Sequence, residues 1–330
     1  MFAPGYIALY KSGELARRAE VLEARLASCG ICPRVCGINR LQGQTGFCHS
    51  ASLPIVASYC AHLGEEPPLS GTKGSGTIFF GNCTMRCVYC QNHQISQDSK
   101  KQQSNEISIS KLAEQMLYLQ DSGCHNINLV TPTHFVPQVL RALMAAVPKG
   151  LNLPLVYNTS GYDSIDVLRM LEGIVDIYLP DLRYASGQAA NDFSGTPDYP
   201  DRARECIKEM YRQVGDLVVD EAGVAQRGLI VRHLILPNRL AGSKELLTWL
   251  ASEVSPSVTV SIMAQYYPAH RALSIPALAR KITLPEYSEV VAWVNQLGLE
   301  NGWLQEIEAA ENYLPDFERG GHPFDSTAAG

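Results

Sequence analysis

Seven of the ten cysteines of this chain fall into two tight groups whose spacing is that of metal ligands. A chain of 330 residues with 46% apolar residues is long enough to build its own core, so it does not depend on a disulfide framework. Clustered cysteines in such a chain indicate metal binding. The first group is Cys29, Cys32, Cys36 and Cys48, and the second is Cys83, Cys87 and Cys90.

The second group is spaced C-x3-C-x2-C within the segment 81–92, directly after the apolar run Thr77–Phe80. Three thiolates fill three corners of a cubane iron–sulfur cluster and leave one iron open for a substrate, whereas structural metal sites usually take four protein ligands. Soft thiolates also suit zinc. The spacing alone therefore leaves a zinc site, completed by His93 or by a distant cysteine, as the alternative.

The first group is spaced C-x2-C-x3-C-x11-C and supplies four ligands, which makes a closed site. Tetrahedral zinc and a second [4Fe-4S] cluster both satisfy this count. The stretch 29–48 is rich in glycine and poor in apolar residues, so we expect it to be irregular and to depend on a bound metal for its order. The role of the metal is then structural, or it is electron relay or direct contact with a substrate.

Short apolar runs alternate with amphipathic stretches after residue 76, which predicts βαβ units and a parallel sheet. No G-x-G-x-x-G follows any of these runs, so an incomplete barrel fits better than a dinucleotide-binding Rossmann sheet. The predicted strands are 77–80, 126–130, 155–157, 175–179, 229–236 and 258–263. The predicted helices are 12–27, 112–119, 136–147, 163–172, 200–214, 243–252 and 289–297.

These elements predict an α/β fold in three parts. An N-terminal helix and a cysteine-rich metal-binding extension occupy residues 1–75. A partial (β/α)6 TIM-like barrel follows over 76–284, and a C-terminal helical cap and tail over 285–330. The barrel is the part expected to carry the reaction.

Polar side chains follow the predicted strands at the points where the strands end. The carboxyl ends of the strands of a parallel barrel meet on one rim, and that rim carries the active site. We therefore expect these side chains to surround one cavity. They are Thr131, Thr133 and His134, then Asn158 and Ser160, then Asp181 and Arg183, then Arg232 and His233, and last Gln265, Tyr266 and His270.

The cysteine loop, with Tyr89 directly before Cys90, resembles the signature of the radical S-adenosylmethionine (SAM) superfamily. The wider string, from HLGEEPP at 62–68 through GSG at 74–76 to YCQN at 89–92, resembles the branch homologous to pyruvate formate-lyase activating enzymes. The resemblance implies a [4Fe-4S] cluster on the three cysteines, with SAM on the fourth iron. One electron then cleaves the S–C5′ bond, and the resulting 5′-deoxyadenosyl radical abstracts a hydrogen atom.

The resemblance also assigns roles by position. Thr131–Thr133 stands where the family has a Gly-Gly-Glu segment that helps to bind the SAM amino group, so hydroxyls or carbonyls replace an acid there. Asp181 and Arg183 resemble an Asp-x-Lys that helps some members hold a monovalent cation near SAM, and Asn158 replaces a second acid of that site. Arg232 suits the SAM carboxylate by bidentate geometry, with a structural salt bridge as the alternative. The residues expected to bind the cofactors are Tyr89, Asn92, Thr131, Thr133, Asn158, Ser160, Asp181, Arg183, Arg232 and Gln265.

Four side chains near the rim are candidates for catalytic groups: His134, His233, Tyr266 and His270. For each histidine the alternative is a hydrogen-bonded scaffold residue. The polar segment 184–200, which we expect to be a loop, follows the fourth strand and is either a lid over the substrate or a plain surface loop.

The composition of the chain limits the classes of molecule that we expect the protein to bind. Twenty-seven Lys and Arg against 33 Asp and Glu give a net charge of −6 without a long basic run, which disfavours nucleic acid. No long apolar window and no basic N-terminal region indicate a cytoplasmic protein that binds no membrane. We expect a flavodoxin- or ferredoxin-like electron donor. The substrate is a protein or peptide, such as a glycine in a partner enzyme, or a small molecule. The alternative function is non-catalytic metal binding or electron transfer.

Overall fold

A computed structural model describes residues 2–307, 315–317 and 323–324. Six parallel strands form the centre of a mixed α/β fold and follow one another in chain order across the sheet. All six correspond to predicted strands, and the arrangement is consistent with a partial TIM-like barrel. They are β2 (Ser75–Phe80), β3 (Ile127–Val130), β4 (Leu155–Thr159), β5 (Ile177–Pro180), β7 (Ala225–Leu234) and β8 (Thr259–Met263).

Burial explains why these segments are strands. Every residue of β2, β4 and β5 is buried, as expected for parallel strands covered by helices on one face and by the barrel interior on the other. The covering helices come between the strands in sequence, and their apolar faces join the main hydrophobic core. They are α6 (Ile109–Asp121), α7 (Val136–Ala146), α8 (Ile165–Met170), α10 (Tyr199–Val214) and α11 (Ser243–Trp249).

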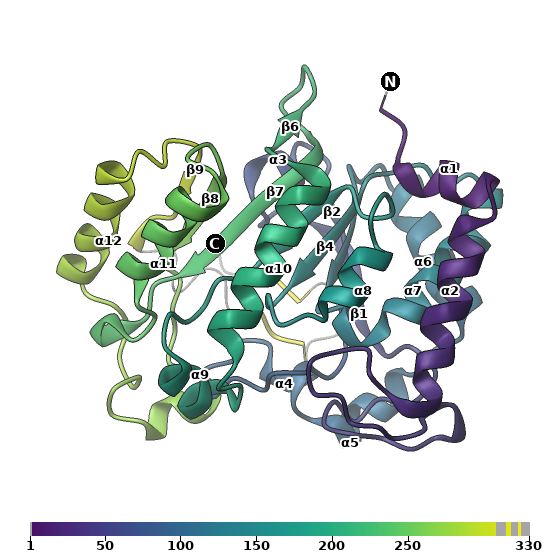
Figure 1. Cartoon of the computed structure of the whole chain (residues 1–330), viewed down its shortest axis with the longest axis horizontal. Helices are drawn as coiled ribbons and strands as arrows, with labels where there is room; N and C mark the ends of the chain where they lie inside the picture. The colour runs from purple at the N-terminus through teal and green to yellow at the C-terminus, as the bar shows by residue number, and fades with distance from the viewer. Residues whose placement is uncertain (1, 308–314, 318–322, 325–330) are drawn as a thin grey trace, which may run out of the picture.

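The ends of the sheet carry further elements (Figure 1). The N-terminal helices α1 (Gly5–Lys11) and α2 (Glu14–Ala24) lie at one side of the molecule, and α12 (Leu284–Gln296) lies with α11 at the other. The single helix predicted over 12–27 is therefore two helices. The chain turns between them at Gly13, whose φ of 80° is open to glycine at no steric cost.

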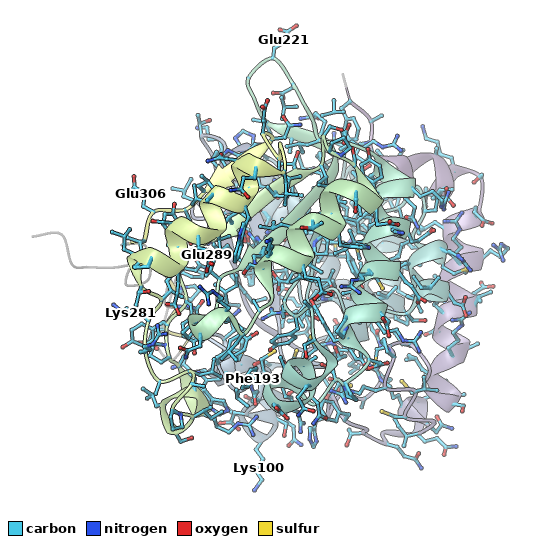
Figure 2. All side chains as sticks on the ribbon, turned by 60° about the vertical axis from the view of Figure 1, so that its left-hand side comes forward. Lys100, Phe193, Glu221, Lys281, Glu289 and Glu306 are labelled. Atoms are coloured by element: carbon cyan, nitrogen blue, oxygen red, sulfur yellow. The ribbon has the colours of Figure 1, made fainter. Side chains whose placement is uncertain are left out.

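Three strands were not predicted. β1 (Val56–His62) pairs antiparallel with β2, β9 (Gly302–Leu304) pairs parallel with β8, and β6 (Val218–Val219) forms a hairpin with β7. Figure 2 shows Glu221, between β6 and β7, at one end of the molecule and Lys100 at the opposite end. Most of the predicted C-terminal tail lies outside the described residues. None of the helices described is long and apolar enough to cross a lipid bilayer.

Candidate active site

A cavity of about 460 Å³ opens at the carboxyl ends of the parallel strands. Its volume is in the range of small-molecule and cofactor sites. The thiols of Cys83, Cys87 and Cys90 line it together with polar residues from the strand ends, so the topology brings together what the sequence separates. All but one of the predicted cofactor-binding residues are among the lining, namely Tyr89, Asn92, Thr131, Asn158, Ser160, Asp181, Arg183, Arg232 and Gln265.

The cysteine loop leaves β2 through two residues in the left-handed region, Asn82 with φ of 66° and Arg86 with φ of 62°. Non-glycine residues adopt this region rarely and only where the surroundings hold them. The surroundings here include the N-terminal extension, because the Asn82 amide donates to the carbonyl of His49 at 3.2 Å and to the hydroxyl of Ser50 at 3.2 Å. The extension thus anchors the loop that carries the three cysteines.

Each thiol of the loop has a hydrogen-bond partner. Ser194 donates to Sγ of Cys87 at 3.0 Å, the backbone N–H of Met85 donates to Sγ of Cys83 at 3.4 Å, and Cys90 lies 3.2 Å from the Ser96 hydroxyl. Such hydrogen bonds stabilise the negative charge of metal-bound thiolates.

Burial raises the pKa of the Cys90 thiol to about 12 and also raises that of Cys83. These thiols therefore keep their protons near neutral pH unless a cation compensates the thiolate charge. Three soft donors around one cavity, each already hydrogen-bonded, fit a cubane cluster with one open iron.

The segment 184–200, which we predicted to be a loop, is partly helical. It contains the helix α9 (Gly187–Ser194), whose C-terminal end packs on the cysteine loop. The backbone N–H of Val88 donates to the carbonyl of Phe193 at 2.8 Å. The Ser186 side chain caps the helix, a signal present in the sequence that we did not use.

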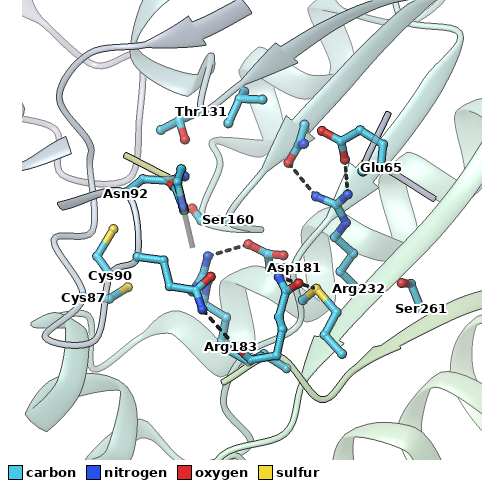
Figure 3. A pocket seen from close by; sticks show the side chains of 18 of the residues that line it. Glu65, Cys87, Cys90, Asn92, Thr131, Ser160, Asp181, Arg183, Arg232 and Ser261 are labelled. Carbon is cyan, nitrogen blue, oxygen red and sulfur yellow. Dashed lines mark hydrogen bonds and ion pairs between the residues drawn. The ribbon is translucent and has the colours of Figure 1, made fainter. Parts of the chain in front are cut away.

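Two arginines that line the cavity are held in ion pairs (Figure 3). Asp181 and Arg183 pair at 2.5 Å. Arg232 pairs with both carboxylate oxygens of Glu66 at 2.6 Å and also with Glu65. The Arg232 guanidinium is thus held by two carboxylates, which is the salt-bridge alternative for this residue.

The acids Glu65 and Glu66 line the cavity and were missed as site residues. Burial and Arg232 act in opposite directions on Glu66, and the net effect lowers its pKa. Two adjacent acids in a segment with few charges would have been a usable signal, because the nearly buried Arg232 needs a counter-charge.

Tyr199 ties the ends of β4 and β5 together. Its hydroxyl donates to the carbonyls of Ser160 at 2.9 Å and Asp181 at 2.8 Å, and it accepts from the backbone N–H of Arg183 at 3.0 Å. Burial raises the pKa of Tyr199, so the hydroxyl keeps its proton. Gly161 makes this approach possible, since a Cβ there would lie 2.4 Å from the Asp181 carbonyl oxygen.

The structure places Thr133 and three of the four catalytic candidates away from the cavity lining. Thr133 donates to Asp163 at 2.8 Å behind the rim. His134 contacts the Gly81 carbonyl at 3.1 Å, and His233 lies between the Leu182 carbonyl and the Ser243 hydroxyl.

His270 stacks on His93 with ring centroids 4.9 Å apart and does not line the cavity. Tyr266 does line it, although its hydroxyl donates to the Leu278 carbonyl at 2.8 Å. The His134 and His233 side chains therefore have the contacts of scaffold histidines, because both are buried and hydrogen-bonded within the protein.

Comparison with known proteins gives similarities in sequence and in structure. The family model described as the radical SAM superfamily matches residues 77–221. An uncharacterized protein of Methanocaldococcus jannaschii is 28% identical over 300 residues, which is 88% of this chain and 81% of that protein.

Two solved structures are similar at low identity. A radical SAM methyltransferase from Sphaerobacter thermophilus has a TM-score of 0.48 and 12% identity over 71% of this chain and 68% of that one. SuiB from Streptococcus suis bound to S-adenosylmethionine has a TM-score of 0.46 and 11% identity over 69% of this chain and 50% of that one. The segment 77–221 that is similar to the radical SAM superfamily begins within β2 and contains the three-cysteine loop.

Proposed function

We propose that the protein is a radical SAM enzyme that abstracts a hydrogen atom from its substrate. The observation that carries the proposal is the shared cavity, which joins the thiols of Cys83, Cys87 and Cys90 to the polar residues at the strand ends. A set of three thiolates leaves one iron of a cubane without a protein ligand. The cavity beside the three thiols is large enough for a cofactor and part of a substrate.

The three cysteines would hold a [4Fe-4S] cluster, and the strand-end residues would hold SAM beside it. When bound, the cluster supplies the electron that cleaves SAM reductively into methionine and a 5′-deoxyadenosyl radical. The chain positions the reactants and limits the access of water. A reduced flavodoxin- or ferredoxin-like protein is the proposed electron donor.

Arg183 is the better candidate for an anionic group of SAM, such as its carboxylate. Its Nε is buried and has no hydrogen-bond partner among the described residues, while one of its Nη atoms pairs with Asp181. A buried donor without a partner is rare and disfavoured. Arg232, by contrast, has its Nε and one Nη occupied by Glu66.

The proposed substrate is a peptide or protein, with a glycine of a partner enzyme as the activase-like case, or a small molecule. The resemblance of the cysteine loop and the HLGEEPP string to activating enzymes supports the first class. Incubation in deuterated solvent with candidate partners, followed by analysis of the 5′-deoxyadenosine for label, would distinguish exchangeable from carbon-bound hydrogen.

Anaerobic reconstitution tests the reaction. Protein with full iron content, dithionite and SAM should yield 5′-deoxyadenosine and methionine, detected by mass spectrometry. Cys87→Ala should abolish the product. Cys60→Ala, in β1 and away from the cavity lining, should not. Full iron content without product would instead support the alternative, a non-catalytic metal-binding or electron-transfer protein.

A further inference from the structure

The four N-terminal cysteines surround a small cavity of their own. Cys29, Cys32, Cys36 and Cys48 all line it, and its volume is about 10 Å³. The stretch that carries them is almost without regular structure and folds back on itself, with the N–H of Cys29 bonded to the Ile38 carbonyl at 2.9 Å. The fold thus brings four thiols from 20 residues of chain to one point.

The size of this cavity distinguishes between metals. The centre of a water-sized sphere can move through this volume, so the lining atoms stand back more than roughly 3 Å from its middle. Zinc binds thiolates at about 2.3 Å and therefore needs them closer together. Within the described residues, which include these four cysteines, no three Cys, His, Asp or Glu side chains are arranged to hold a single metal ion. Thiols that surround a centre at a distance are the arrangement of a polynuclear cluster, in which each thiolate binds a different iron.

The positive charges around the cavity of the four N-terminal cysteines favour a bound anion. Arg40 lines it and is 1% exposed, yet its guanidinium donates only to the neutral carbonyls of Ala51 and His134. Among the described residues, no carboxylate lies within ion-pair distance of Arg40 or Arg34. A buried cation without a counter-charge is destabilising. A metal centre with four thiolates carries net negative charge and would supply it.

Arg34 connects this cavity to the three-cysteine loop. Arg34, between Cys32 and Cys36, donates from Nε to the carbonyl of Thr84 at 2.9 Å. The ring of Phe47 lies 3.8 Å from the Arg34 guanidinium and 4.7 Å from that of Arg86. Arg86 belongs to the three-cysteine loop, and its Nε is buried with no partner among the described residues.

We infer that Cys29, Cys32, Cys36 and Cys48 bind a second iron–sulfur cluster, of the closed [4Fe-4S] type, next to the three-cysteine loop. Arg40, Arg34 and Arg86 compensate its charge. With four protein ligands it has no open iron, so it does not bind SAM. The inference does not depend on the proposed function, because it concerns the metal content of a different set of cysteines.

The inference of a second cluster is tested by counting iron and zinc atoms per chain in anaerobically reconstituted full-length variants. Wild-type protein should contain about eight iron atoms per chain, as two cubanes require. The triple variant C83A/C87A/C90A should retain about four iron atoms, and its reduced form should show a [4Fe-4S] EPR signal. The double variant C32A/C36A should also retain about four, with the signal of the other cluster. Cys60→Ala serves as the matched cysteine control and should keep the wild-type count.

The triple variant decides the result even when the double variant fails to fold, because it leaves all four N-terminal cysteines in place. One zinc and no iron in the triple variant would overturn the inference, and so would the absence of any metal. SAM cleavage is measured in an assay separate from the metal analysis. An inactive protein with eight iron atoms would contradict the proposed function and leave the second cluster established.

Discussion

Ser194 donates its hydroxyl hydrogen to Sγ of Cys87 across 3.0 Å, and the Tyr184 hydroxyl lies 2.7 Å from the same Ser194 oxygen. Because the single Ser194 hydrogen points to sulfur, the Tyr184 hydroxyl must donate to Ser194. The result is a chain of two hydrogen bonds directed at one cysteine of the loop. It makes α9, which carries Ser194, part of the electrostatic environment of the three-cysteine loop.

Replacement of Ser194 should change the reduction potential of the cluster proposed for the three cysteines. A hydrogen bond to a thiolate favours the reduced, more negative cluster, so Ser194→Ala should lower the potential. Loss of about 1 kcal/mol corresponds to roughly 40 mV for a one-electron couple. EPR-monitored titration measures the shift. Ser122→Ala, which removes an exposed helix-end hydroxyl, is the control and should leave the potential unchanged.

Tyr199→Phe should weaken SAM binding, because Ser160 and Asp181 lose the donor that holds their carbonyls together. Leaving buried acceptors unpaired costs about 1–3 kcal/mol in unfolding free energy. The matched control is Tyr178→Phe, which removes a buried hydrogen bond to Gln213 on the far side of the sheet from the cavity. Both variants should be destabilised in thermal unfolding, but only Tyr199→Phe should raise the Kd for SAM. Equal SAM affinity in the two variants would show that Tyr199 has a structural role only.

The two arginines of the cavity should respond differently to substitution. Arg183→Gln should raise the Kd for SAM by about tenfold or more, since it removes a charged hydrogen bond worth about 1.5–3 kcal/mol. Arg232→Met should mainly destabilise the fold, by about 3–5 kcal/mol, because Glu65 and Glu66 are left buried without a counter-charge. Isothermal titration and urea unfolding separate the two effects. A larger loss of SAM affinity in Arg232→Met would restore Arg232 as the carboxylate ligand.

The strands and the rim were predictable because they depend on local sequence. Parallel strands buried on both faces are apolar runs, and chain order gave their order in the sheet. The edge strand β1 was missed because only its end residues, Val56 and His62, are buried, and polar and small residues lie between them. The partners of Arg232 were missed for a different reason. Glu66 lies 166 residues away in sequence, so the adjacent acids indicate that a cation is needed but not which cation they meet.

For two histidines the sequence predicted a functional role, whereas the structure shows scaffold contacts. Position at a strand end suggested catalytic roles for His134 and His233, but a strand-end residue points either into the cavity or behind it. His233 directly follows Arg232 on β7, and successive side chains of a strand point to opposite faces, so only one of the two enters the cavity. In the structure both rings are buried, and burial lowers the pKa of His134 to about 3 and lowers that of His233.

The stability of the fold should depend on pH through Asp176, which lies far from both cysteine groups in sequence. Its carboxylate accepts backbone N–H bonds from Leu155 at 2.9 Å and Gly5 at 3.3 Å, and burial raises its pKa to about 7. The folded state therefore keeps this proton up to about pH 7, whereas the unfolded chain loses it near pH 4. Between these values the folded state binds more protons, so Asp176 lowers the unfolding free energy as pH rises, by up to about 1.4 kcal/mol per pH unit.

Asp176→Asn does not ionise and should lack this contribution. Anaerobic urea unfolding from pH 4.5 to 8 should give curves that diverge, with the variant gaining relative to wild type as pH rises. Parallel curves would mean that Asp176 ionises normally in the folded protein.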